Sequence, residues 1–164
     1  MIFITFIRMS LMKRIKYVLI LLIAFIAFNN KGYAQTTTPI EHAFESISKL
    51  RGFERFPDEL AKERYSMLGG KVAMVGYGNA DPRDQVLEIL DKIPNDQLCY
   101  EFRFGANNAK IERYYLSTDK NGNDIMLYVF VGTGGNDLVA VLFTDAPQGQ
   151  YKSIIEEVRN YNNN

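Results

Sequence analysis

The sequence predicts an α+β fold: N-terminal helices, then a four-stranded antiparallel meander, then a C-terminal helix. Apolar residues recur at helical spacing through most of residues 40–93, whereas from Leu98 onward they alternate with period two. Asn121-Gly122 lies between two alternating runs and is a strong hairpin signal. Strands that follow one another through tight turns indicate an antiparallel sheet rather than a parallel α/β arrangement.

The first predicted helix has four apolar residues at helical spacing: Ile40, Phe44, Ile47 and Leu50. Gly52 ends it, and residues 53–56 follow as a brief extended segment. Pro57 then opens a second helix, because the N–H that proline lacks is not needed at the first helical position. This second helix ends at Gly69 and Gly70.

A β-prone segment, residues 71–78, precedes a third helix. Asp81, Pro82 and Asp84 supply an N-cap, a proline at the first position and an acid in the first turn. Pro94 ends the helix. Its buried face is predicted to consist of Val86, Leu87, Leu90 and Ile93.

The meander is predicted to have four strands, at residues 98–104, 110–117, 124–131 and 138–143. A turn at residues 144–149 leads to a last helix at about residues 150–161, and the asparagine tail is expected to fray. The last two strands are apolar on both faces, which leaves two alternatives. Either the helices divide between the two faces of the sheet, or one face keeps an exposed apolar patch.

Residues 1–34 are predicted to be a secretory signal peptide, so residues 35–164 form a single mature α+β domain. Three basic residues precede an apolar run of 12 residues at 17–28, and Ala34 completes a small-x-small cleavage site. The run is shorter than the roughly 20 residues of a spanning helix. We therefore expect an exported protein, periplasmic or extracellular, with no membrane span after cleavage.

The start of the leader and the charge of the mature chain follow from the same segment. Met12 is a better start than Met1, because the residues between them are apolar and lack an n-region; if they are real, an uncleaved anchor is the alternative. Residues 1–34 carry five basic and no acidic side chains, so the mature chain has 14 basic and 19 acidic ones, a formal charge of −5. This acidic balance argues against nucleic-acid binding.

Cys99 is the only cysteine, so no intrachain disulfide can form and the core must hold the domain. Two interpretations of the thiol are open. It is either a nucleophile or part of an intermolecular disulfide, or it is a small apolar group that fills space in a strand. His42 is the only histidine, which excludes a multi-histidine metal site, and we expect it at the border of the first helix or facing solvent.

Two loop motifs are better explained by turns than by ligands. Asp119, Asn121 and Asn123 have calcium-loop spacing, but Asp124 and Phe130 stand where that loop needs Gly and Glu. Residues 132–135 are glycine-rich but lack the Gly-Lys-Ser/Thr of a phosphate loop. No catalytic, cofactor-binding or metal-binding residue is predicted.

The charged and aromatic side chains of the meander remain as candidates. Glu101 and Glu112 can face each other across neighbouring strands, although Arg103 and Arg113 would more simply pair with them as cross-strand salt bridges. A glycosidase-type pair of carboxylates is therefore not indicated. The candidate ligand or partner surface comprises Tyr100, Arg103, Arg113, Tyr115, Met126, Tyr128 and Phe130.

The order of these motifs resembles a family of small exported domains of unknown function common in Bacteroidota. The similarity is closest over residues 111–158, where a charged-aromatic strand, a Lys-Asn-Gly turn, two strands and a terminal amphipathic helix follow in order. Residues 144–149 take the place of the family's glycine-containing turn, and the match there is inexact. The resemblance implies export and this α+β order, and it implies no catalytic residues.

Two functions are consistent with these features. The first is a non-enzymatic binding or interaction module of the cell envelope, whose partner is another envelope protein or a second copy. The second is a small-ligand-binding protein or small hydrolase with a site between sheet and helices, in a pocket lined by Tyr100, Arg103, Arg113 or Tyr115.

Overall fold

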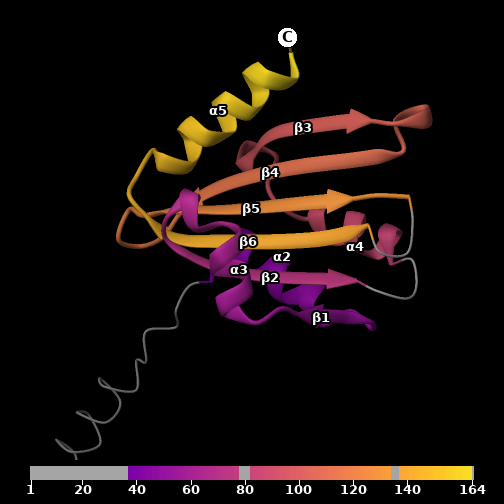
Figure 1. Cartoon of the computed structure of the whole chain (residues 1–164), viewed down its shortest axis with the longest axis horizontal. Helices are drawn as coiled ribbons and strands as arrows, with labels where there is room; N and C mark the ends of the chain where they lie inside the picture. Colours follow the sequence, from indigo (N-terminus) through magenta and orange to yellow (C-terminus); the bar gives the residue numbers. More distant parts are fainter. Residues whose placement is uncertain (1–36, 78–81, 134–136, 164) are drawn as a thin grey trace, which may run out of the picture. The chain divides into compact units, whose positions relative to one another are not determined.

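The computed structural model describes residues 37–77, 82–133 and 137–163, which form a six-stranded antiparallel sheet with helices on both faces (Figure 1). The strands are β1 (Phe53–Arg55), β2 (Lys71–Tyr77), β3 (Leu98–Phe104), β4 (Lys110–Thr118), β5 (Asp124–Val131) and β6 (Leu138–Ala146). The α-helices are α2 (Pro39–Ser48), α3 (Asp58–Arg64), α4 (Arg83–Leu90) and α5 (Gln150–Asn162). Short 3₁₀ helices are η1 (Ser66–Leu68), η2 (Asn95–Gln97) and η3 (Ala106–Asn108). The predicted signal peptide and the predicted N-cap Asp81 lie outside the described residues.

The α+β class, the antiparallel sheet and the C-terminal helix are confirmed, but the prediction of four strands is wrong. The strand order is β1-β2-β6-β5-β4-β3, so the predicted meander is extended by two strands. β2 runs antiparallel to β6 from Lys71, opposite Thr144, to Tyr77, opposite Leu138. A strand that is apolar on both faces is best placed inside a sheet, and β2 gives β6 a second neighbour.

The helices divide between the two faces of the sheet, as the first alternative predicted. On the face covered by α2 and α4, here called the back face, Phe44, Ile47 and Leu90 pack against β5 residues such as Leu127. A capping box fixes the start of α2, because Thr38 and Glu41 bond reciprocally to each other's backbone N–H. The back face is therefore sealed by an amphipathic pair of helices.

The opposite face, here called the front face, is covered in part by α3 and α5. Its core comprises Ala61, Met74, Met126, Val141, Phe143, Ala146, Tyr151 and Ile155. The start of α5 is held by the buried carboxylate of Asp124, which accepts a hydrogen bond from the Tyr151 backbone N–H at 3.1 Å. Gln150 donates to the Leu68 carbonyl at 2.7 Å and the Tyr151 hydroxyl to the Gly69 carbonyl at 3.2 Å.

Gly70 is required where η1 meets β2. Its φ is +71°, and a Cβ there would lie 2.3 Å from the Thr144 carbonyl oxygen and 2.5 Å from the Tyr151 hydroxyl. Only glycine allows both the left-handed backbone and this close approach. The double glycine that the sequence analysis took as a helix end therefore also lets α5 dock beside the sheet.

Several element boundaries differ from the predicted ones. The second helix ends at Arg64, and η1 continues it as a tighter turn before the glycines. Pro57 and Pro82 precede the first helical residue instead of occupying it. β6 continues to Ala146, because Thr144 pairs with β2 and Ala146 with Asp124, which shortens the predicted turn after it.

Candidate functional site

Part of the front face lies between the two helices that cover it, and aromatic side chains line it. Cross-strand register sets them in rows: Tyr100, Tyr114 and Tyr128 form one row over β3, β4 and β5, and Phe102, Glu112 and Phe130 form the next. Phe104 follows beside Lys110. We call the six rings at positions 100, 102, 104, 114, 128 and 130 the aromatic floor. All six are half-buried.

The rings of the aromatic floor contact one another continuously. Tyr100, Phe102 and Phe104 stack along β3 with interplanar angles of 12° and 20°, and Phe104 continues onto Phe130 at 25° with centroids 6.2 Å apart. Tyr114 joins Tyr100 to Tyr128, with centroids at 6.0 Å and 5.0 Å. Such pairs contribute about 0.5–1.5 kcal/mol each beyond burial, so the floor is a preformed surface.

Glu112 lies at the centre of this floor. Its Oε1 accepts a hydrogen bond from the Tyr128 hydroxyl at 3.3 Å and its Oε2 one from the Tyr114 hydroxyl at 3.4 Å. Within the described residues no Lys or Arg lies within ion-pair distance of this carboxylate. A half-buried carboxylate that only neutral hydroxyls contact can still accept hydrogen bonds from a cation.

The two tyrosines that contact Glu112 are held as hydrogen-bond donors. Burial, and next the negative charge of Glu112, raise the pKa of Tyr114 and of Tyr128 well above the usual tyrosine value. Both hydroxyls therefore keep their protons across the physiological range and continue to orient the carboxylate.

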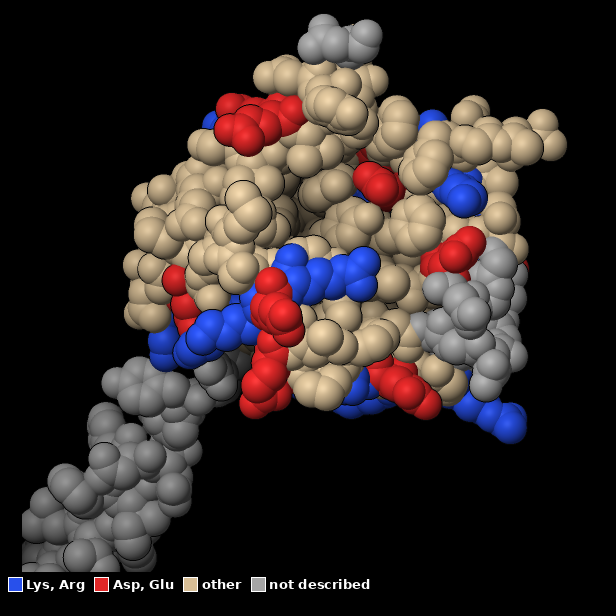
Figure 2. All heavy atoms as spheres, viewed as in Figure 1, with Lys and Arg blue, Asp and Glu red and all other residues tan. Residues whose placement is uncertain are grey.

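Figure 2 shows this face as a hollow whose floor consists mostly of uncharged residues, with an acidic group among them. The helices beside it carry exposed apolar side chains: Leu60 of α3 is 47% exposed, Met67 of η1 is 96% exposed and Tyr161 of α5 is 84% exposed. Among the described residues these are all of the exposed large hydrophobic side chains. They all belong to α3, η1 and α5, the elements of the front layer.

The structure separates the residues that the sequence analysis assigned to one surface. Tyr100, Tyr128 and Phe130 lie on the front face, whereas Arg103, Arg113 and Tyr115 alternate onto the back face. Met126 is on the front face but is buried in the core, so it is no part of an accessible surface. A pocket that combines Tyr100 with the two arginines is therefore excluded by the register of β3 and β4.

On the back face, Arg113 is occupied by an ion-pair network. Its Nε donates to Glu101 at 2.7 Å, and its Nη1 donates to Asp91 at 2.8 Å and to the Tyr115 hydroxyl at 3.3 Å. Burial disfavours its charge, but these partners outweigh that effect and its pKa lies above the usual arginine value. Arg103 binds the other oxygen of Glu101 at 2.6 Å.

Glu101 therefore forms the predicted salt bridges, whereas the prediction that Glu112 also pairs with an arginine is wrong. The alternative that the two glutamates face each other does not occur either. Partial burial favours a protonated Glu101, but the hydrogen bonds from Arg103 and Arg113 prevail and lower its pKa. Glu112 is one residue out of phase with Arg113 on β4, so it points to the opposite face.

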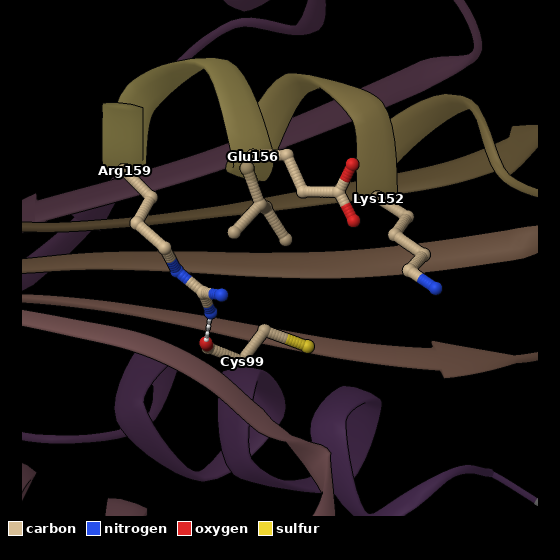
Figure 3. Close-up of a pocket in the computed structure, with 5 residues that line it drawn as sticks. Cys99, Lys152, Glu156 and Arg159 are labelled. Carbon is tan, nitrogen blue, oxygen red and sulfur yellow. Dashed lines mark hydrogen bonds between the residues drawn. The ribbon is translucent and has the colours of Figure 1, made fainter. Parts of the chain in front are cut away.

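Cys99 lines a shallow hollow of about 150 Å³ between β3 and α5, together with Lys152, Ile155, Glu156 and Arg159 (Figure 3). Arg159 donates a hydrogen bond to the Cys99 carbonyl and its guanidinium lies 5.6 Å from the Tyr100 ring centre, while the thiol points away from it. Burial raises the pKa of this thiol despite the nearby positive charge. A protonated, half-buried thiol fits the space-filling reading better than the nucleophilic one.

The other sequence motifs have structural roles. His42 is exposed on α2, beside a hollow between α2 and α4. Asp119 accepts hydrogen bonds from the Asn121 and Asn123 backbone N–H groups at 2.7 Å and 2.9 Å, which closes the β4–β5 hairpin as predicted. The glycine-rich loop is described only at its ends, where the Gly132 N–H donates to the Asp137 carbonyl.

Sequence reasoning missed four members of the candidate site: Phe102, Phe104, Glu112 and Tyr114. A signal for them was present, because residues separated by an even number of positions in one strand share a face. That rule alone places Tyr100 with Phe102 and apart from Arg103. The hydrogen bonds to Glu112 depend on the register between strands, which the sequence pattern does not specify.

Comparisons of this chain with protein-family models, with curated proteins and with solved structures found no match. None of the helices among the described residues combines the length and the apolar character that crossing a bilayer requires. The binding surface is therefore inferred from the chemistry of the front face.

Proposed function

We propose that this protein is an exported, non-enzymatic binding module that recognises a protein partner through the front face of its sheet. The observation that carries the proposal is the aromatic floor, whose six rings remain half-buried around a carboxylate that no described cation pairs with. Aromatic residues that are rigid and partly exposed are the usual anchors of protein interfaces.

The exposed apolar side chains beside the floor support a macromolecular partner. Leu60, Met67 and Tyr161 add exposed apolar side chains on α3, η1 and α5. The rings of the aromatic floor contact one another, and a contiguous apolar surface of this kind is uncommon on proteins that act alone. A small-ligand site needs an enclosed pocket with converging polar groups, and the residues first considered for one are divided between the two faces.

Export is the part of the proposal that rests on the leader and on the resemblance to exported domains. Fractionation of the cells that make this protein tests it: we expect the chain outside the cytoplasm, with Gln35 as its first residue. Recovery of the uncleaved chain from the cytoplasm would contradict it.

Site-specific photo-cross-linking in living cells tests the binding surface. A photoreactive phenylalanine analogue replaces Phe104 or Phe130 on the front face, and His42, exposed on the back face, is the matched control. We expect both front positions to yield the same discrete cross-linked product and position 42 to yield none. No product at the front positions, or the same product from position 42, would contradict the proposal.

A further inference from the structure

We propose that the partner places an arginine side chain against Glu112, with its guanidinium in contact with the stacked rings of Phe102, Phe104 and Phe130. This inference rests on the proposed function, because it names the chemistry of the group that the front face binds. It is carried by the hydrogen-bonding capacity of Glu112, the rings on either side of it and the charge of the floor.

The carboxylate of Glu112 has unused hydrogen-bonding capacity. Each of its oxygens accepts one tyrosine hydroxyl, at 3.3 Å and 3.4 Å, and these are the only donors to it within the described part of the chain. An ionised carboxylate offers about four acceptor positions, so one on each oxygen remains. Two parallel N–H donors of a guanidinium match two such positions.

The neighbours of Glu112 across the sheet are aromatic on both sides. Phe102 on β3 and Phe130 on β5 are its register partners. The stacked rings of Phe102, Phe104 and Phe130 have nearly parallel planes, with angles of 20° and 25° between successive rings. A planar cation that approaches Glu112 from above the sheet can contact these rings while it binds the carboxylate, which a tetrahedral ammonium does less well.

Lys110 is the nearest competing cation along the strand. It lies two residues before Glu112 on the same side of β4 and is half-buried beside Phe104. It makes no ion pair with Glu112. A bound guanidinium would be weakly repelled by it, so replacing Lys110 should tighten binding slightly.

A titration with short peptides tests the inference on the protein purified from its own cells. The probes are acetyl-Gly-Arg-Gly-amide, its lysine analogue and its citrulline analogue, which keeps the planar shape without the charge. NMR follows the Glu112, Tyr114 and Tyr128 signals up to about 10 mM peptide, since a single ion pair of this kind binds in the millimolar range. We expect saturable shifts with arginine, weaker ones with lysine, and affinity at least about tenfold lower with citrulline.

Three variants sharpen the test. Glu112→Gln keeps the shape of the side chain and should lower the arginine-peptide affinity about tenfold, the loss expected for one charge-assisted contact. Glu45→Gln, at an exposed position on α2, is the control and should leave it unchanged. Lys110→Gln should raise it by up to a few fold.

Equal shifts with arginine and citrulline, no saturable shift at all, or unchanged affinity in Glu112→Gln would each overturn the inference. The proposed function fails separately, in the cross-linking experiment. If cross-links form at Phe104 and Phe130 in both the original protein and the Glu112→Gln variant with equal yield, the front face binds a partner but not through an arginine.

Discussion

The two faces of the sheet arise from the same strands but are finished in different ways. On the back face, α2 and α4 bury Phe44, Ile47 and Leu90 completely or nearly so. On the front face, α3 and α5 cover Met126 and Phe143 but leave Phe102 and its aromatic neighbours half-buried. The back face therefore contributes mainly to stability, whereas part of the front face remains available for binding.

Charge follows the same division. The carboxylate of the back face, Glu101, is fully engaged by Arg103 and Arg113, whereas Glu112 on the front face is held only by tyrosine hydroxyls. The two salt bridges of Glu101 satisfy its carboxylate within the chain. The carboxylate of Glu112 keeps acceptor positions that its two tyrosine hydroxyls do not fill.

The largest effect is expected from truncating a side chain in the core of the back face. Phe44 is 1% exposed within the back-face core, so Phe44→Ala removes a buried ring and leaves a cavity. We expect the free energy of unfolding to fall by about 3–5 kcal/mol. Urea unfolding followed by circular dichroism measures this, and a loss below about 1 kcal/mol would show that the back face is not the principal core.

A similar test addresses how the front layer is attached. Gly70→Ala combines a left-handed backbone with a Cβ only 2.3 Å from a carbonyl oxygen, whereas Gly122→Ala has the left-handed backbone with no atom within 4 Å. We expect about 1–2 kcal/mol of destabilisation for Gly122→Ala and a clearly larger loss for Gly70→Ala. Equal unfolding midpoints for the two variants would contradict the close docking of α5.

The buried carboxylate at the start of α5 gives a third effect. Asp124 is 2% exposed and accepts the Tyr151 N–H, so Asp124→Ala leaves that donor buried without its partner. We expect a loss of about 1–3 kcal/mol in the free energy of unfolding. Hydrogen exchange of the α5 amides should accelerate more than that of the α2 amides, and uniform acceleration would count against a local role.

The front face should tolerate truncation of a side chain better than the back face. Phe102→Ala removes a partly exposed ring, and we expect a loss of about 1–2 kcal/mol in unfolding free energy, smaller than for Phe44→Ala because part of the Phe102 surface is already in contact with water. In the Phe102→Ala variant, the cross-link to the partner that forms from position 104 should nevertheless disappear. A stability loss as large as that of Phe44→Ala would mean that the ring belongs to the core.

The smallest effect concerns pH. The pKa of Glu101 is lowered in the folded state, so its contribution to stability is present above the ordinary glutamate pKa of about 4.3 and is lost as pH falls through the lowered value. We expect Glu101→Gln to flatten the fall of unfolding midpoint between about pH 5 and pH 3. Glu157→Gln, at an exposed position on α5, is the control and should keep the original slope.

Much of this architecture could be predicted, because local patterns determine it. Period-two alternation located β3 to β6, and the Asn-Gly turn identified the β4–β5 hairpin. The partner of β6 could not be predicted, since β2 lies more than 60 residues earlier and pairing over that separation leaves no local mark. The grouping of the predicted surface residues was wrong for a different reason. Arg113 and Tyr115 were grouped with Tyr100 because of their chemistry, although the strand period puts them on the opposite face of the sheet.

Oxidative footprinting of the aromatic side chains tests the central claim most directly. Hydroxyl radicals oxidise accessible Phe102, Phe104 and Phe130, and exposed His42 reports on the back face. We predict that the three rings are oxidised in the purified protein and severalfold less in living cells, while oxidation of His42 stays the same. Equal oxidation of the rings in both conditions would contradict the claim that the front face is a binding surface.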